Sequence, residues 1–317
     1  MMMTVTKYQP GDKAEWDKMV KLSRNGTFLH LRDYMDYHSD RFTDFSLVAR
    51  DEDRIIAVMP ACREGNTLFS HRGLTYGGWL LPRLHFDVTV MLEIWEQTVE
   101  VLREHGIIHI VYKPVPHIYH RYPAEEDLYA IFSGGAKLAE SNISTTIDLD
   151  EPIAFDRGNR GNVNVARKSG VEVCESDDWD GYWQVLGSLL QERYSTLPVH
   201  TVDEIKLLKL RFPENIKLYT ATLDGTIVAG VVMYLCGEEV AHCQYIASTA
   251  EGRSVKALSL LFDYLIKEAT EAGFRYFDFG ISNEDHGRYL NEGLVRQKSR
   301  MGGRGIVYNT YSIDLKK

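Results

Sequence analysis

The sequence contains little cysteine and no long apolar run. Its four cysteines, Cys62, Cys174, Cys236 and Cys243, have neither metal-binding nor redox spacing. All but Cys174 sit in or beside apolar, strand-like stretches, which is typical of small hydrophobic residues in a reducing compartment. No apolar run is long enough to cross a membrane, and residues 1–13 lack the apolar centre of a signal peptide. We therefore expect a cytoplasmic protein with no metal centre and no membrane span.

The chain is acidic, with 36 Lys and Arg against 45 Asp and Glu and a formal net charge of -9. Because such a surface repels phosphate backbones, we do not expect duplex DNA as a partner. A local basic cluster could still hold one phosphorylated ligand. The length of 317 residues favours two domains, each large enough for its own core.

The most informative feature is an internal repeat. Residues 46–61 and 217–233 each read as a strand, a charged turn and a second strand, and a third strand follows in both copies. A helix comes next in both, with apolar residues at helical spacing between a capping residue and a terminal glycine. Each glycine leads into another strand, so the repeat predicts a duplicated α/β domain. The cap and glycine are Asp87 and Gly106 in the first copy, and Ser254 and Gly273 in the second.

Helical segments precede both hairpins, and a closing strand separates the two copies. The closing strand and crossover read from 136 to 152, and the domain boundary falls near residue 155. The predicted helical segments are residues 13–24, 31–40, 177–195 and 201–212.

This element order is that of the GNAT acyltransferase fold, and the tandem arrangement resembles the Fem-type peptidyltransferases and the related acetyltransferase-6 proteins. The resemblance covers nearly the whole chain. It implies an α/β fold with mixed sheets, built as two tandem GNAT domains: residues 1–155 on the acceptor side and 156–317 on the donor side. The segments that carry it are "SHRGLTYGG" (70–78), "RKSGVEV" (167–173), "PVHTVDEIKLL" (198–208), and "YFDFG" (276–280) followed by "LVRQKSRMGG".

The family implies an enzyme that transfers an acyl or aminoacyl group to an amine. In ordinary GNAT enzymes the donor is acyl-coenzyme A, and its pyrophosphate binds at the N-terminus of the helix after the fourth strand. Here that loop is residues 248–257, where an ordinary capped helix is the alternative reading. The predicted cofactor-binding residues are Ile246, Ala247, Ser248, Gly252, Arg253, Ser254 and Val255.

A basic cluster follows the strand and polar loop near the end of the chain. Arginine pairs with phosphate through two parallel hydrogen bonds, and lysine supplies a point charge. The resemblance implies that Lys298 approaches the donor. The candidate bases are His242, Tyr245, Asp278 and His286, none of which stands out, because His242 and Asp278 also read as satisfied interior groups. The cluster comprises Arg288, Arg296, Lys298, Arg300 and Arg304, against Glu292 alone.

Two loops are candidates for the acceptor side. The first follows a strand and carries polar side chains that a glycine turn alone does not explain. The second joins two helices, and a simple helix end is the alternative reading there. A third segment, 157–170, is rich in Arg and Lys, and a solvated loop is its simpler interpretation. The predicted substrate-binding residues are His71, Arg72, Tyr76, Gly77, Tyr194, His200 and Arg296.

Together with the basic cluster, the resemblance therefore implies an N-acyltransferase of cell-envelope biosynthesis. We expect acetyl-CoA or another acyl-CoA as donor and, as acceptor, the amine of a small phosphorylated or nucleotide-linked precursor. The first alternative is a Fem-like peptidyltransferase that uses aminoacyl-tRNA. The second is a binding module that kept the fold and lost the donor site.

Overall fold

The computed structural model describes residues 3–315, except for the side chain of Tyr194. The chain forms two compact units that are not contiguous in sequence. The first unit comprises the described residues up to Asn142, residues 285–289, and the chain from Val307 on. The second comprises residues 143–284 and 290–306. Residues 143–155, which the sequence analysis assigned to the first domain, belong to the second unit, and the last strand returns to the first.

The first unit contains a three-stranded sheet and one part of a larger mixed sheet. The small sheet has the order β1-β3-β4, and the larger part has the order β2-β5-β6-β7-β16-β8. Parallel pairing occurs between β6 and β7. The core packs α3 against these strands around Trp95, Leu102 and Ile110. The strands are β1 (Met3–Lys7), β2 (Thr43–Asp44), β3 (Leu47–Asp51), β4 (Arg54–Met59), β5 (Cys62–Glu64), β6 (Thr67–Phe69), β7 (His109–Tyr112), β8 (Lys137–Asp148) and β16 (Arg304–Asp314). The helices are α1 (Lys13–Leu22), α2 (Arg32–Met35), α3 (Val88–Glu104) and α4 (Glu126–Ser133).

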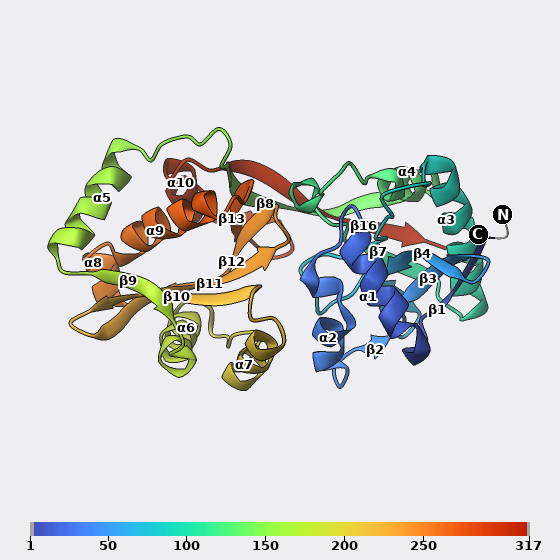
Figure 1. Cartoon of the computed structure of the whole chain (residues 1–317), viewed down its shortest axis with the longest axis horizontal. Coiled ribbons are helices and arrows are strands. Elements are labelled where there is room, and N and C mark those ends of the chain that lie inside the picture. The colour runs from blue at the N-terminus through green and yellow to red at the C-terminus, as the bar shows by residue number, and fades with distance from the viewer. Residues whose placement is uncertain (1–2, 316–317) are drawn as a thin grey trace. The chain divides into compact units, whose positions relative to one another are not determined.

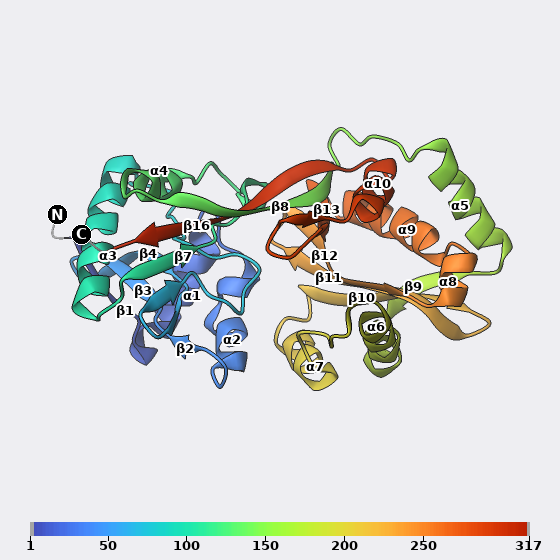
Figure 2. The same ribbon diagram turned by 180° about the vertical axis from the view of Figure 1, so that it is seen from behind.

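The second unit is a mixed sheet with helices on both faces. Its strand order is β8-β13-β12-β11-β10-β9, antiparallel except for the β12–β13 pair. Helix α9 covers one face, and α6 and α7 lie on the other (Figures 1 and 2). The strands are β9 (Glu172–Ser176), β10 (Ile216–Leu223), β11 (Thr226–Cys236), β12 (Val240–Ser248) and β13 (Tyr276–Ile281), with the short pair β14 (Asn283–Glu284) and β15 (Tyr289–Leu290) after them. The helices are α5 (Arg157–Lys168), α6 (Trp179–Tyr194), α7 (Val202–Arg211), α8 (Ala250–Ser254), α9 (Ala257–Glu271) and α10 (Glu292–Arg300).

Both repeated hairpins and the helix that follows each are confirmed. Asp87 caps α3, because its carboxylate accepts the Thr89 N–H at 2.8 Å. Gly106 and Gly273 follow the two helices with φ of +73° and +82°, the left-handed conformation that glycine adopts without strain.

Three local predictions were wrong. Ser254 ends α8 instead of capping the long helix, and Lys256, with φ of +61°, stands at the start of α9. The basic segment from 157 is helix α5, and the polar loop before Lys298 contains helix α10.

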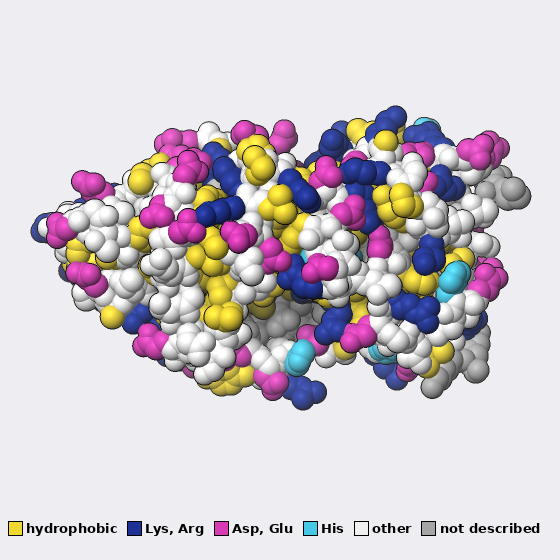
Figure 3. Space-filling model, turned by 90° about the horizontal axis from the view of Figure 1, so that it is seen from below, with side chains coloured by type: hydrophobic (Ala, Val, Ile, Leu, Met, Phe, Trp, Pro, Cys, Tyr) yellow, Lys and Arg dark blue, Asp and Glu magenta, His cyan; other side chains and the backbone are white. Residues whose placement is uncertain are grey.

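Acidic and basic side chains are mixed on the face drawn in Figure 3.

Candidate active site

Strands β12 and β13 lie side by side at one end and separate along their length. They pair in parallel register over Val240–His242 and Tyr276–Asp278. Beyond these residues the structure gives no further pairing between the described parts of the two strands. Gly280, with φ of +76°, lies where β13 also shifts register against β8. His242 and Asp278 occupy the point where this separation begins.

A bulge in β12 determines which side chains face the site. Tyr234 pairs with His242 and Met233 with Cys243, but the next residue of β11, Val232, pairs with Tyr245. Gln244 is therefore the extra residue of a β-bulge. Because Val232 and Tyr234 are two residues apart, they share a face, and their partners His242 and Tyr245 share it with them. Without the bulge, a separation of three residues would put His242 and Tyr245 on opposite faces.

His242 and Asp278 form a buried pair on that face. The His242 Nδ1 lies 2.7 Å from the Asp278 Oδ2. Asp278 has no exposed surface, and its Oδ1 accepts hydrogen bonds from Ser144 Oγ at 2.5 Å and Thr146 Oγ1 at 2.8 Å. A carboxylate only accepts, so this arrangement keeps the imidazole proton on Nδ1 and leaves Nε2 able to take a proton.

Lys298 reaches the same strand from α10. Its ammonium donates to Gly280 O at 2.7 Å, Ile281 O at 2.9 Å and Ser282 Oγ at 3.0 Å, which uses all three of its protons. The side chain is buried, and burial lowers its pKa to about 8, although the nearby Asp278 charge acts in the opposite direction. Lys298 therefore fastens the end of β13 where that strand leaves its neighbours. Burial also raises the pKa of the Cys243 thiol, which stays protonated.

Tyr245 and His200 are brought together from separate elements. The Tyr245 hydroxyl lies 2.5 Å from His200 Nδ1, and the indole N–H of Trp183 donates to His200 O at 3.1 Å. Nearby on α6, Tyr182 packs so closely on β11 that a Cβ at Gly230 would lie 2.4 Å from its ring. The Tyr182 hydroxyl is buried and has no hydrogen-bond partner among the described residues.

A polar pocket of about 530 Å³ lies between the start of α9 and helices α5 and α10. It brings together four of the predicted residues, Ser248, Gly252, Arg253 and Arg296. Asp156 is the single acidic residue in its lining. Within the described structure, no side chain caps the N-terminus of α9, although the Ser259 N–H already donates to Lys256 O at 3.0 Å, and the positive end of the helix dipole lies at this end of the pocket. The cations that line the pocket are Arg253, Lys256, Arg296 and Arg300.

The remaining predicted donor residues lie outside that lining. Ile246 and Ala247 belong to β12, and Ala247 is buried against Gly230 of β11. The Ser254 Oγ donates to Glu251 O at 2.9 Å, and Val255 packs against the core of the second unit. Arg253 and Ser248 also line a second polar pocket, of about 590 Å³, together with residues of α6.

The predicted acceptor residues of the first unit contribute to its packing. His71 is buried and stacked on His38 with ring centroids 5.1 Å apart, and burial lowers its pKa to about 3. Tyr76 is buried, and Gly77 lies so close to Ser70 O that a Cβ would not fit. Arg72 forms an ion pair with Glu64 at the surface. The side chain of Tyr194 lies outside the described residues, and His286 contacts Glu140 at 3.1 Å.

Three further residues of the site, Ser144, Thr146 and Lys256, were not predicted from the sequence. Ser144 and Thr146 alternate along β8 and hold Asp278, and two hydroxyl residues at strand spacing inside the closing strand were the available signal. Lys256 has a left-handed backbone conformation that is uncommon for lysine, and no residue pattern around it indicates that conformation.

Comparison with known proteins identifies the fold. A family model described as an acetyltransferase (GNAT) domain matches residues 154–288. The crystal structure of FemX superposes with a TM-score of 0.69 at 14% identity, over 99% of this chain and 97% of that one. A tandem GNAT protein from the clavulanic acid biosynthesis pathway gives 0.55 at 12% identity, over 100% and 99%. The C-terminal domain of a putative lysylphosphatidylglycerol synthetase from Agrobacterium fabrum gives 0.62 at 14%, over 96% and 91%. No curated protein matches.

The family match over residues 154–288 and the fold support an acyltransferase that contains a GNAT domain. Residues 154–288 match the GNAT acetyltransferase domain, and the chain has the tandem GNAT fold that the sequence predicted. The whole-chain similarity to FemX is a similarity of fold. Among residues 3–315, no three or more His, Cys, Asp or Glu side chains are grouped to hold a metal ion, and no helix is long and apolar enough to cross a membrane.

Proposed function

We propose that this protein is an N-acyltransferase that moves an acyl group, most simply acetyl, from acyl-CoA to the amine of a small acceptor. The observation that carries the proposal is the His242–Asp278 pair at the point where β12 and β13 separate. Strand β12 then continues to Ser248, which lines the basic pocket. A base and an anion site thus stand on one strand.

The basic pocket suits the phosphates of coenzyme A. Four cations face one carboxylate, and the uncapped start of α9 adds N–H donors and the positive end of the helix dipole. Arg253 is held in position because it donates to Ser248 O at 2.8 Å. Bound in this pocket, acyl-CoA would supply an acyl group activated as a thioester.

His242 is the proposed general base. Its Nε2 accepts a proton from the acceptor amine while the amine nitrogen bonds to the acyl carbon. The bond from that carbon to the thioester sulfur then breaks, and the leaving thiolate takes up the proton from Nε2, which releases the amide and free CoA. Asp278 stabilises the imidazolium that forms. Backbone N–H groups of β12 beyond His242, where β13 no longer pairs, are proposed to stabilise the developing oxyanion. Lys298 is assigned a positioning role, because its protons are engaged by β13 and Ser282.

The acceptor is proposed to be an amine on a phosphorylated or nucleotide-linked envelope precursor. Tyr245 and His200 are the proposed acceptor contacts, because they share the His242 face of the sheet and hold each other at 2.5 Å. A phenol and an imidazole offer one donor and one acceptor to a polar substrate.

Isothermal titration of the full chain with acetyl-CoA and with free CoA tests the donor. We expect one site per chain, weakened at least tenfold by Arg253→Gln combined with Arg296→Gln, since each charged hydrogen bond contributes about 1.5–3 kcal/mol. The matched control is Lys206→Gln, an exposed cation paired with Asp180 on the other face. His242→Gln should keep donor binding and lose transfer to a panel of amines. No heat at millimolar ligand, with the fold intact by circular dichroism, would overturn the acyl-CoA donor.

Aminoacyl-tRNA is a second candidate donor, and helix α5 favours it. Its twelve residues include no acid, and it presents Arg157, Arg160, Arg167 and Lys168 at the surface. The same helix lines the basic pocket through Gly158, so a polyanion could extend from that pocket along α5. A gel shift of tRNA that disappears as salt rises, in a protein that does not bind acetyl-CoA, would select this donor.

A further inference from the structure

A second and chemically different pocket lies on the opposite side of helix α5. It has a volume of about 400 Å³, within the range of small-molecule sites. Helix α5 faces the basic pocket with Asn159 and Asn162 and faces this one with Val163 and Arg167. The proposed function assigns a ligand to the basic pocket but none to this second pocket.

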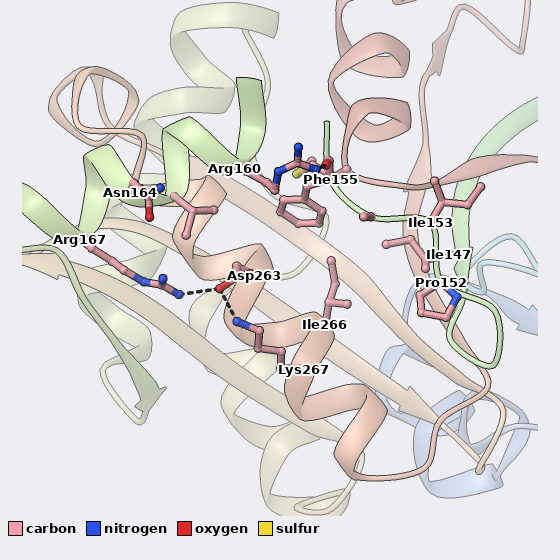
Figure 4. A pocket seen from close by; sticks show the side chains of 13 residues that line it. Ile147, Pro152, Ile153, Phe155, Arg160, Asn164, Arg167, Asp263, Ile266 and Lys267 are labelled. Atoms are coloured by element: carbon pink, nitrogen blue, oxygen red, sulfur yellow. Dashed lines mark hydrogen bonds and ion pairs between the residues drawn. The ribbon is translucent and has the colours of Figure 1, made fainter. Parts of the chain in front are cut away.

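The body of the pocket is apolar. Ile147, Val163 and Met301 are buried beneath it, and Ile266 of α9 forms part of its wall. The remaining wall is an apolar segment of four residues, 152–155, whose Ile153 keeps 47% of its surface exposed. Figure 4 shows Pro152, Ile153 and Ile147 together on one side of the cavity. Leaving four successive apolar residues beside an open cavity is unfavourable unless an apolar ligand covers them.

Cationic side chains of α5 and α9 form much of the remaining lining. Asp263 accepts from Arg167 and from Lys267, each at 2.8 Å, and these three side chains stand together in Figure 4. Arg160 donates one of its N–H groups to Phe155 O at 2.5 Å and lies over the Phe155 ring. Three cations against one carboxylate leave an excess of positive charge beside an apolar cavity.

We propose that this pocket binds a single alkyl chain ending in a carboxylate, with the chain against Ile153 and Ile266 and the anionic head at Arg160. An apolar body with one anionic end matches both sides of the pocket at once. A neutral hydrocarbon would leave the cations unused, and a highly charged phosphate ligand would leave the apolar wall uncovered. A free fatty acid has this chemistry, and a lipid with a singly charged anionic head group would share with it an alkyl chain beside one negative charge.

Titration of the full chain with hexanoate, octanoate and decanoate, below the concentrations at which they form micelles, tests the proposal. We expect one site per chain and about fourfold tighter binding for each added methylene until the pocket is full. Octanol should bind more weakly than octanoate. Arg160→Gln should weaken octanoate about fivefold, as expected for one exposed ion pair, and Lys168→Gln, which changes a neighbouring cation outside the lining, should not.

Two variants test whether the chain occupies this cavity. Ile266→Trp fills it, and Ile153→Asp adds a carboxylate at an exposed position where the fold tolerates the change. Both should abolish octanoate binding while acetyl-CoA titration is unchanged, which separates this proposal from the donor site. Absence of decanoate binding at about 1 mM, equal affinity for octanol, or unchanged binding by Ile153→Asp would overturn it. Cosedimentation with phosphatidylglycerol vesicles but not phosphatidylcholine vesicles, lost in Ile153→Asp, would identify a lipid chain as the source, and binding of free carboxylates alone would identify a fatty acid.

Discussion

Replacing Asp278 with asparagine keeps the size of the side chain and tests whether its charge orients His242. The Asp278 Oδ1 accepts from two hydroxyls, Ser144 and Thr146, and Oδ2 faces His242 Nδ1 at 2.7 Å. Because both hydroxyls donate to Oδ1, we expect asparagine to keep its oxygen there and to turn its NH₂ toward the imidazole. His242 Nδ1 then accepts a hydrogen bond, so the ring proton moves to Nε2. The lone pair proposed to take the proton of the amine is lost.

The expected loss of kcat equals the rate acceleration that one general base contributes. Transfer by Asp278→Asn should fall about 10²–10⁴-fold in kcat, while the donor Kd stays the same. The free energy of unfolding should change by only about 1 kcal/mol, because the variant keeps the same number of hydrogen bonds. The assays are thiol release in the presence of an accepted amine, and nitrogen-15 spectra of the imidazole ring, assigned by their loss in His242→Gln.

The activity assay and the imidazole spectra test different parts of the proposal. Full activity with the proton on Nε2 would refute His242 as the base. An unchanged tautomer would refute the hydrogen-bond geometry itself. Ser144→Ala is the matched control, because Thr146 still donates to Oδ1, so the carboxylate keeps its orientation and activity should fall less than tenfold.

Three further changes test other parts of the structure. Burial raises the pKa of Asp127 from 3.8 to about 7, so the folded state holds a proton that the unfolded state releases above pH 4. This stability is present in acid and is lost as the pH rises through 7, by about 4 kcal/mol. Asp127→Asn should flatten that slope in urea titrations, and an unchanged slope would contradict the assignment. Lys298→Met should cost about 2–4 kcal/mol of stability, because Gly280 O loses its buried donor. The same variant should lower kcat and leave the pH profile of the reaction unchanged. A shifted pH profile would mean that Lys298 itself titrates in the reaction. Tyr182→Phe should raise the melting temperature by removing an unpartnered hydroxyl, worth about 1 kcal/mol, and a loss of activity alongside that gain would show that the phenol meets substrate.

The fold was predictable because its signals are local and occur twice. Apolar periodicity predicted both long helices. Asp87 and the two terminal glycines predicted three of the four ends of these helices, and charged turns indicated the hairpins. Helices α5 and α10 were missed because both are strongly polar, and their stability comes from packing that a sequence pattern does not contain. In α5, Val163 and Ala166 are the only described residues that are both buried and apolar. Two such positions in twelve residues give too weak a helical signal.

The site was harder to predict because two of its features depend on pairing between strands. Candidate bases His242, Tyr245 and Asp278 were all identified, but their relationship depends on register. His242 meets Asp278 because β12 and β13 align at that pair, and it shares a face with Tyr245 because Gln244 is a bulge. The segment "AHCQYIAS" does not indicate a bulge, because it has no glycine or proline at or beside Gln244. Deleting Gln244 should restore strict alternation and turn Tyr245 away from His200. The shortened strand would keep Tyr245 and His200 in the sequence but separate them in space. The bulge is therefore as much a part of the proposed site as either of these side chains.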